Sequence, residues 1–289
     1  MNNGAKNIVT RVIDLVMKCL LVVIMVFPFY WMVITAFKTQ KESMIFPPTL
    51  IPSQITFESF STVMEKIPFG LFFKNSLIIA LSVVLLQFIV VVPAAYGFAK
   101  YNFRCKNLFF AFVLLGFMLP QQITFAPSYL MFNKVGLLNS YAPMIIPFIG
   151  NAFGIFLLRQ YFLQIPQEII EAARLDDASE WKIIVRIMIP MARTAISSIG
   201  LLSFISSWNS YFWPLVMTSN NTYRTLPIGV TLLTGSEGAS QWPIVMAGNL
   251  MMVLPILVVY GFASGKIRKA FVYSGITVSY THLRAHETL

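Results

Sequence analysis

The chain has 289 residues, of which 57% are hydrophobic, 15% are aromatic and 11% are charged, and its formal net charge is +10. A soluble domain carries about 25% charged residues, so this composition excludes a single water-soluble core and indicates a protein of the lipid bilayer. Cys19 and Cys105 are the only cysteines. Both fall in a predicted span or on the predicted cytoplasmic side, which argues against a disulfide framework.

Six apolar runs are long enough to cross a bilayer as helices, because about 20 residues span its hydrocarbon core. In chain order these runs are Val16–Phe37, Asn75–Ala99, Leu108–Leu130, Tyr141–Leu163, Thr194–Val216 and Trp242–Ala263. The sequence therefore predicts an all-α integral membrane protein with six transmembrane helices. The first run lacks a small-residue cleavage site, so we expect it to remain as an anchor.

Proline occurs inside most of these runs, at Pro28, Pro93, Pro120, Pro127, Pro147 and Pro255. Membrane helices tolerate proline because neighbouring helices and side chains pair with the carbonyl groups that it leaves free. We therefore expect structural kinks at most of these positions, with some of them shaping a pathway.

The distribution of Lys and Arg predicts the orientation of the chain, because cytoplasmic loops carry an excess of these residues. With the N-terminus inside, fourteen of the 21 basic residues fall on the cytoplasmic side, six fall outside and Arg284 lies in the tail. Both termini are therefore predicted to be cytoplasmic, with residues 1–15 before the six-span domain 16–264 and residues 265–289 after it. This topology explains the positive charge without a nucleic-acid partner.

An acidic segment stands out in this apolar chain. The sequence EIIEAARLDDASEWKIIVRIMIP, from Glu168 to Pro190, holds five of the eleven acidic residues. It lies in the longest predicted cytoplasmic loop, residues 164–190. A helix that rests on lipid headgroups is usually rich in Lys and Arg, whereas the first half of this segment is acidic. Docking of a cytoplasmic partner is therefore the favoured interpretation, and an interfacial helix is the alternative.

The loop has the pattern of two helices joined by a turn. Pro166 suits the first helical position, where its missing N–H would have no partner. Asp177 or Ser179 can cap the second helix. Ala172 and Ala173 are small enough to let another surface approach closely.

The residues EAARLDDASEWKIIVRIMIP resemble the EAA loop of permease subunits of ABC importers. The matching residues are Glu171, Ala172, Ala173, Asp176, Ala178 and Pro190. At Asp177 the family usually has Gly, so a left-handed turn at this position would be less favourable in this chain.

Further segments resemble the carbohydrate-uptake branch of the same family. They are SFISSWNSYFWPLV at Ser203–Val216, FKNSLIIA with Asn75 and Ser76, and LPIGV at Leu226–Val230. Over roughly residues 10 to 277, the chain is similar to sugar permeases related to the smaller membrane subunit of the maltose system.

This resemblance implies a fold, partners and a location. The fold would be that of a type I ABC importer permease, in a multi-pass protein of a bacterial cell membrane. The partners would be a second permease subunit, two ATP-binding subunits and an extracytoplasmic solute-binding protein. ATP and Mg would be bound by the partner ATPase subunits, so this chain would hold no cofactor and would not be an enzyme.

The resemblance also implies roles within the loop. Its coupling residues would be Glu171, Ala172, Ala173, Asp176, Asp177 and Ala178, which together would seat the helix pair in a groove of the ATPase. Glu171 would pair with a cation there, and Asp176 would cap or pin the turn.

The candidate substrate path consists of Trp208, Asn209, Tyr211 and Trp213. Aromatic faces can stack on a sugar, and the amide can bind hydroxyl groups, although the same cluster could pack the bundle or anchor it at the membrane interface. A sugar or oligosaccharide is the expected solute, with glycerol-3-phosphate or another polar solute as the alternative. The absence of an intramembrane Arg favours a neutral sugar. Which permease subunit holds the site stays open.

Other classes of membrane protein fit less well. An ion-coupled secondary transporter needs ionisable residues within its spans, but the mid-span polar residues here are neutral: Gln87, Asn151, Asn209 and Asn249. An intramembrane enzyme would need a carboxylate pair, a metal cluster or a nucleophile with a base, and no histidine precedes His282. A passive channel or a structural membrane protein stays open on pattern alone.

The chain ends with VSYTHLRAHETL, residues 278–289, which is unlike the tail of the family. We expect it to be disordered or foreign to the protein. Its His282 and His286 are too few to make a strong metal site. GFASGK, at Gly261–Lys266, lacks the spacing and the Ser or Thr of a phosphate-binding loop, so ATP must be bound by another subunit.

Overall fold

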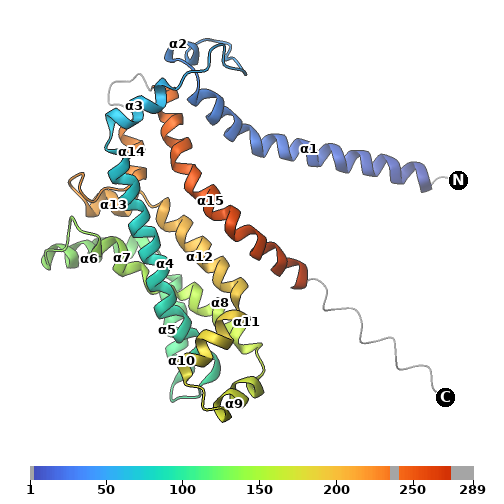
Figure 1. Cartoon of the computed structure of the whole chain (residues 1–289), viewed down its shortest axis with the longest axis vertical. Coiled ribbons are helices and arrows are strands. Elements are labelled where there is room, and N and C mark those ends of the chain that lie inside the picture. Colours follow the sequence, from blue (N-terminus) through green and yellow to red (C-terminus); the bar gives the residue numbers. More distant parts are fainter. Residues whose placement is uncertain (1–2, 235–240, 275–289) are drawn as a thin grey trace. The chain divides into compact units, whose positions relative to one another are not determined.

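The computed structural model describes residues 3–234 and 241–274, with side chains described for 10–234 and 241–262. Every regular element in these ranges is helical, which confirms the all-α class. The tail 278–289, including both histidines, lies outside the described residues. The elements, shown in Figure 1, are α1 (Asn3–Ala36), α2 (Gln40–Ser43), α3 (Glu58–Lys66), α4 (Phe69–Lys100), α5 (Lys106–Met118), α6 (Gln121–Lys134), α7 (Ala142–Ile145), η1 (Ile146–Phe148), α8 (Ala152–Leu163), α9 (Gln167–Leu175), α10 (Glu180–Ile183), η2 (Ile184–Met188), α11 (Ile189–Met191), α12 (Arg193–Trp208), α13 (Phe212–Met217), α14 (Leu226–Leu232) and α15 (Trp242–Ser274).

Four helices in the described part of the chain are long and apolar enough to cross a membrane. They are Thr10–Ala36, Phe69–Lys100, Ala142–Leu163 and Trp242–Phe262. Two bent helix pairs raise the number to six if each pair forms one span: Lys106–Met118 with Gln121–Lys134, and Glu180–Met191 with Arg193–Trp208. The six runs read from the sequence therefore correspond to four to six spans.

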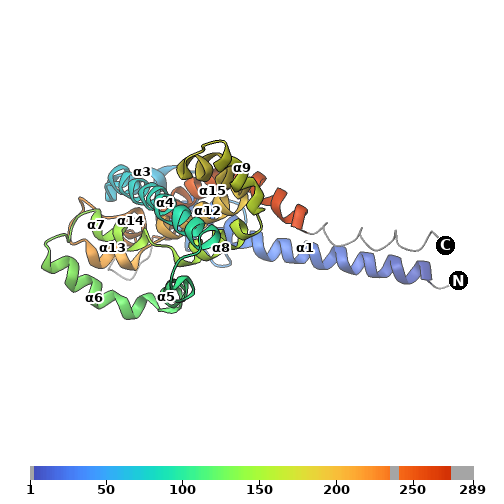
Figure 2. The ribbon, with the colours of Figure 1, turned by 90° about the horizontal axis from the view of Figure 1, so that it is seen from below.

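The third predicted run, Leu108–Leu130, is not one straight helix. α5 and α6 meet at an angle of 95° (Figure 2). Leu119 lies between them in an extended conformation, with φ −73° and ψ 121°, because the ring of Pro120 disfavours a helical conformation for the residue before it. By contrast, the prolines at positions 28, 93, 127 and 255 lie inside helices, as expected.

The fifth predicted run, Thr194–Val216, is also interrupted. α12 ends at Trp208 and α13 begins at Phe212. At its other end, α12 is bent by 84° from the segment Glu180–Met191. Hydropathy located the apolar residues correctly, but the backbone leaves the helical conformation within the run.

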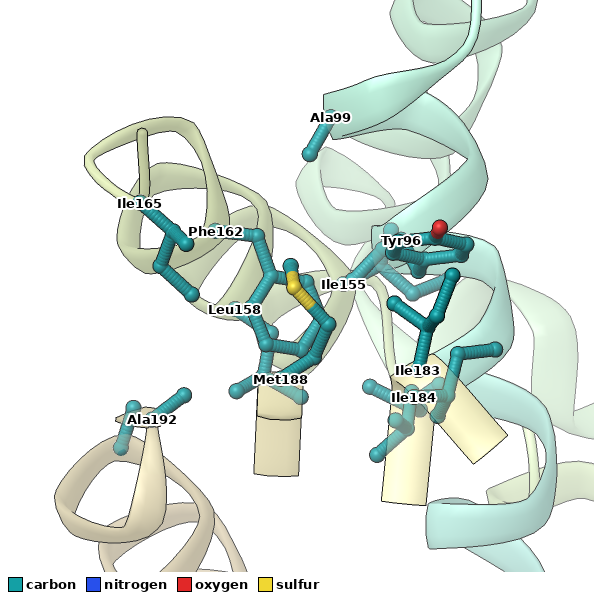
Figure 3. Packing of buried hydrophobic residues seen from close by; sticks show 14 of the residues in the cluster. Tyr96, Ala99, Ile155, Leu158, Phe162, Ile165, Ile183, Ile184, Met188 and Ala192 are labelled. Carbon is teal, nitrogen blue, oxygen red and sulfur yellow. The ribbon is translucent and has the colours of Figure 1, made fainter. Parts of the chain in front are cut away.

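Contacts divide the chain into two compact units, Met1–Gly70 with Ile228–Pro255, and Leu71–Pro227 with Ile256–Leu289. The main hydrophobic core belongs to the second unit and gathers side chains from α4, α8, α9 and the segment from α10 to α12 (Figure 3). The core members on α4 are Val91, Val92, Ala95, Tyr96 and Ala99. One half of α4 therefore organises this unit.

In the second unit, Asn75 and Ser76 of the segment FKNSLIIA contact the chain at and just before Leu226, the first residue of the segment LPIGV. The Leu226 amide donates a hydrogen bond to the Ser76 hydroxyl at 2.8 Å. The Asn75 amide donates to the carbonyl oxygens of Thr222 and Arg224, each at 2.9 Å. Asn75 is fully buried, so these bonds satisfy a polar group inside the protein and hold the segment before α14 against α4.

Candidate functional site

The turn between α9 and α10 closes with a C-terminal capping motif. The Ala178 amide donates to the Ala173 carbonyl oxygen at 3.0 Å, and the Asp177 amide donates to the Arg174 carbonyl oxygen at 3.1 Å. This pair of bonds defines the Schellman motif, in which the residue after the C-cap is left-handed. Asp177 occupies that position with a φ of 52°. The left-handed turn is therefore present, at a position where glycine has no steric cost.

The second helix of the loop is capped by Ser179. Its hydroxyl accepts a hydrogen bond from the Lys182 amide at 3.3 Å. Asp177, the other candidate cap, occupies the left-handed position of the turn. Pro166 precedes the first residue of α9 and acts as its N-cap rather than as its first helical residue. The predicted pattern of two helices is confirmed, and the second helix continues through a π-helical stretch, Ile184–Met188.

One face of the loop packs on the bundle. Ile170, Ile183, Ile184 and Met188 are buried in the core that α4 and α8 share with the loop. Figure 3 shows Ile183 and Ile184 beside Tyr96. Ala173 and Ala178 are half-buried and pack against the same core. These contacts fix the helix pair on the bundle.

The opposite face is exposed and combines carboxylates with large apolar side chains. Glu171, Ala172, Asp176 and Asp177 are exposed. The six predicted coupling residues therefore divide, with these four on the outer face and two alanines on the inner face. Leu175 is 86% exposed and Trp181 is 61% exposed. Sequence reasoning had not singled out either as an outward-facing residue, although each is a large apolar residue within an acidic stretch.

Glu180 links the loop to the end of α4. Its Oε1 accepts a hydrogen bond from the Arg174 Nε at 2.9 Å, and its Oε2 accepts one from the Tyr96 hydroxyl at 2.6 Å. The Arg174 guanidinium lies 5.5 Å from the centre of the Tyr101 ring. The hydrogen bond to the Glu180 carboxylate raises the pKa of Arg174 above its ordinary value. Water screens this partly exposed ion pair, so the network orients the turn against the end of α4 rather than contributing much to stability by itself.

A cavity of about 890 Å³ lies in the same unit, lined by α4, α5, α6, α8, α12, α13 and the segments that join them. Its polar lining includes Gln87, Asn151, Ser203 and Tyr211. No charged side chain is among the described residues that line it. The cavity therefore offers hydroxyl and amide groups beside aromatic and aliphatic walls.

Gln87 joins three helices at the wall of the cavity. Its Nε2 donates to the Phe148 carbonyl oxygen at 2.7 Å, and its Oε1 accepts from the Ser203 hydroxyl at 2.6 Å and from Asn151 Nδ2 at 3.4 Å. The Asn151 side-chain oxygen in turn accepts from the Gly154 amide at 2.8 Å and so caps α8. Sequence reasoning had identified Gln87 and Asn151 as neutral polar residues within spans, and it had included Ser203 in the segment Ser203–Val216 without assigning it a role.

The structure separates the four residues predicted for the substrate path. Trp208 is fully buried and stacks on Phe204, with ring centres 5.7 Å apart. Asn209 is exposed and does not line the cavity, whereas Tyr211 and Trp213 do. Two of the four residues therefore reach the cavity, and Trp208 packs the bundle.

Cys19 and Cys105 are free and exposed. Among the residues that the structure describes, no group of three or more His, Cys, Asp or Glu side chains could hold a metal ion.

Comparison with known proteins relates this architecture to a family. Residues 91–265 match the family model described as binding-protein-dependent transport system inner membrane component. The chain is 33% identical over 260 residues to the arabinooligosaccharides transport system permease protein AraQ of Halalkalibacterium halodurans, which covers 88% of this chain and 90% of that protein. It is 31% identical over 240 residues to the sn-glycerol-3-phosphate transport system permease protein UgpE of Pectobacterium atrosepticum, with 81% and 85% covered.

Two solved structures are similar in fold. One belongs to a bacterial ABC transporter involved in the import of the acidic polysaccharide alginate, with a TM-score of 0.81, 24% identity, and 90% of this chain and 97% of that chain covered. The other is a bacterial alginate ABC transporter in complex with an alginate pentasaccharide-bound periplasmic protein, with a TM-score of 0.64, 17% identity, and 92% and 96% covered. At these identities the likeness shows the fold alone.

The left-handed conformation of Asp177 leads to a prediction about the stability of the protein. Asp177→Gly is expected to raise the free energy of unfolding by up to about 1 kcal/mol, because the left-handed conformation then has no Cβ clash, although a more flexible unfolded chain offsets part of the gain. Thermal unfolding of the purified protein in detergent measures the change. Asp176→Gly is the matched control, since Asp176 has a negative φ of −83°, which any residue adopts, and its replacement is expected to destabilise. Equal effects of the two substitutions would contradict the strain at Asp177.

The hydrogen bond between Tyr96 of α4 and Glu180 of the loop leads to a second prediction. Tyr96→Phe removes one hydrogen bond to Glu180 and is expected to lower the free energy of unfolding by about 1 kcal/mol. Tyr161→Phe is the control, because Tyr161 is half-buried against the same core and its hydroxyl makes no hydrogen bond to any described residue. If both substitutions shift the unfolding temperature equally, the Tyr96–Glu180 bond contributes nothing specific.

Proposed function

The chain belongs to the family of binding-protein-dependent transport system inner membrane components, and we propose that it carries a neutral saccharide across the membrane as a permease subunit of an ATP-driven importer. Relatives are named for arabinooligosaccharides and for sn-glycerol-3-phosphate. The observation that supports the neutral saccharide over the phosphate is the absence of any charged side chain among the described residues lining the 890 Å³ cavity. A phosphate group there would lose water without gaining a counter-charge, which is costly in a membrane protein.

The lining of the cavity suits a sugar in a second respect. Tyr211 and Trp213 contribute aromatic rings, which can cover the apolar C–H face of a sugar, while amide and hydroxyl groups can bind its hydroxyls. Trp213 is held in place because its Nε1 donates to the Pro143 carbonyl oxygen at 2.7 Å. Sites for small molecules are usually lined by apolar and aromatic side chains with a few neutral polar groups among them, as this cavity is.

The topology that we propose has six spans, with each bent helix pair counted as one crossing and with both termini in the cytoplasm. The excess of Lys and Arg on that side supports this orientation. It places the loop of α9 to α11 in the cytoplasm of a bacterial cell, where the ATP-binding subunits would lie.

The exposed face of the loop is the surface that we propose to dock on an ATPase subunit. Trp181 is an anchor of the kind that dominates protein interfaces, and Leu175 adds exposed apolar surface beside it. The carboxylates of Glu171 and Asp176 beside them can pair with cations of the partner, which selects the partner by charge. ATP and Mg would be held by two such ATPase subunits. A second permease subunit and an extracytoplasmic binding protein would complete the importer.

α4 offers a physical route from this docking surface to the cavity. Glu180 binds Tyr96 of α4, and Ile183 packs in the core that contains the same residue. Gln87 lies nine residues earlier on α4 and lines the cavity, so the two positions are about 14 Å apart along the helix. A displacement of the loop by the ATPase would therefore move α4 and change the cavity.

Cysteine crosslinking tests the docking surface. Ala172→Cys and Leu175→Cys, in a chain whose Cys19 and Cys105 are replaced by serine, are expected to crosslink to cysteines on the ATPase in membrane vesicles, with a yield that changes on addition of ATP. Ala173→Cys is the control, because Ala173 faces the core and is expected to react less. Absence of any crosslink from the two exposed positions in an inserted, folded chain would contradict the coupling assignment.

Uptake measurements test the substrate class. Vesicles that contain the complete importer are expected to accumulate a labelled arabinooligosaccharide and not labelled glycerol-3-phosphate. Tyr211→Ala is expected to reduce that uptake at least tenfold while the protein stays folded, whereas Trp208→Ala is expected to lower the free energy of unfolding by about 3–5 kcal/mol because it removes a buried ring. Uptake of glycerol-3-phosphate alone would overturn the neutral-saccharide proposal.

A further inference from the structure

The segment that follows α1, residues 39–57, buries a carboxylate and exposes its large apolar side chains. Glu42 is the only residue of this segment that is buried. Its Oε1 accepts hydrogen bonds from the Thr49 hydroxyl at 2.9 Å, from the Ser53 amide at 2.8 Å and from the Ser53 hydroxyl at 3.0 Å. The large apolar side chains are all exposed, namely Met44, Ile45, Phe46, Leu50, Ile51, Ile55 and Phe57. A segment surrounded by water would be expected to show the opposite distribution.

This segment is fixed to the end of α1 at several points. The Tyr30 hydroxyl donates a hydrogen bond to the Leu50 carbonyl oxygen at 2.5 Å, and the Lys38 ammonium donates one to the Thr49 carbonyl oxygen. The Thr56 amide donates to the Phe37 carbonyl oxygen at 3.0 Å. The exposed apolar side chains are therefore held in place by a tethered backbone.

The contact with Tyr30 sets the depth of the segment along α1. Tyr30 lies six residues before the last residue of α1, Ala36, which corresponds to about 9 Å of helix. Residues 10–30 of α1 are all exposed, and the span that contains them is apolar. Leu50 consequently lies beside a part of α1 that is suited to lipid, and the apolar surface of the segment continues the apolar surface of the span.

The charge pattern of the segment indicates that its exposed apolar side chains contact lipid and not a soluble protein. Residues 43–57 contain no charged side chain, and Phe46 and Ile51 are 92% and 76% exposed. A surface that docks and releases a soluble protein normally has a polar rim around its apolar centre. Apolar and aromatic side chains without charges are instead typical of segments at the boundary between headgroups and acyl chains.

We propose that the tip of this segment, residues 44–52, is a membrane-interface anchor that inserts Ile45, Phe46, Leu50 and Ile51 into the headgroup–acyl boundary of the lipid bilayer. The buried Glu42 holds the tip in shape, and Tyr30 sets its depth. This assignment rests on the membrane location of α1 and not on the transported solute, so it stands or falls separately from the saccharide proposal.

Spin-label accessibility tests the anchor. A nitroxide is attached at Phe46→Cys, or separately at Ile51→Cys, in a chain whose Cys19 and Cys105 are replaced by serine, within the complete importer in vesicles of phosphatidylethanolamine and phosphatidylglycerol. Collisions with oxygen, which concentrates in lipid, are compared with collisions with a water-soluble nickel chelate. The control is Glu65→Cys, at an exposed acidic position on α3.

The oxygen-to-nickel ratio is expected to be at least fivefold higher at positions 46 and 51 than at position 65. Adding Glu42→Ala to the labelled chain is expected to lower that ratio, because the tip then loses the oxygen that accepts hydrogen bonds from Thr49 and Ser53. A ratio at position 46 equal to that at position 65 would place the tip in water and overturn the proposal. Low collision with both reagents would mean that a protein partner covers the tip, and that result would also overturn it.

Discussion

Lipid offers no hydrogen bonds, so a chain within a bilayer must pair its backbone polar groups internally, and irregular backbone is tolerated only where it is buried in protein or lines a water-filled cavity. The described spans of this chain follow that constraint closely. Their helices are interrupted at 119–120, at 149–151, at Ala192 and at 209–211. Ala192 is buried in protein, and residues of the other three interruptions line the 890 Å³ cavity: Leu119, Gly150, Asn151, Ser210 and Tyr211. At those three interruptions the backbone departs from helix where a polar solute and water would supply the missing partners.

α4 connects this cavity to the loop of α9 to α11. Its residues Val91, Val92, Ala95 and Tyr96 belong to the main core, and Gln87 on the same helix binds Ser203 of α12. Packed cores resist continuous deformation because their side chains interdigitate. A helix that contacts the loop near its C-terminal end and the cavity wall near its middle is therefore well placed to transmit a movement between them.

Two glutamates have comparable structural roles in different parts of the chain. Glu180 binds Arg174 and Tyr96 and fixes the turn after α9, which leaves Leu175 and Trp181 exposed. Glu42 binds Thr49 and Ser53 and fixes the segment after α1, which leaves Phe46 and Ile51 exposed. In both cases internal hydrogen bonds order a short segment in advance. Its apolar side chains can then contact another surface without a large loss of conformational entropy.

The local features of this protein were determined by the sequence itself. Long apolar runs specified helices, and Asp177 or Ser179 was expected to cap the second helix of the loop, because both features depend on neighbouring residues only. The structure then assigned the cap to Ser179 and the left-handed turn to Asp177. The break at Pro120 also follows from a local rule, because proline disfavours a helical conformation for the residue before it. Hydropathy alone had predicted one uninterrupted span there. The residues of the EAA loop were likewise sufficient to identify the family.

Only the tertiary structure decided which side chains meet and which face outward. It buried Ile170 and exposed Leu175, turned Ala172 outward and Ala173 inward, and brought Tyr96 to Glu180 across 84 positions of sequence. It also placed Tyr211 at the cavity and Trp208 in the core. The physical reason is that lipid and protein interior are both apolar, so hydropathy cannot tell the outer face of a membrane helix from its inner face, and only packing in three dimensions separates them.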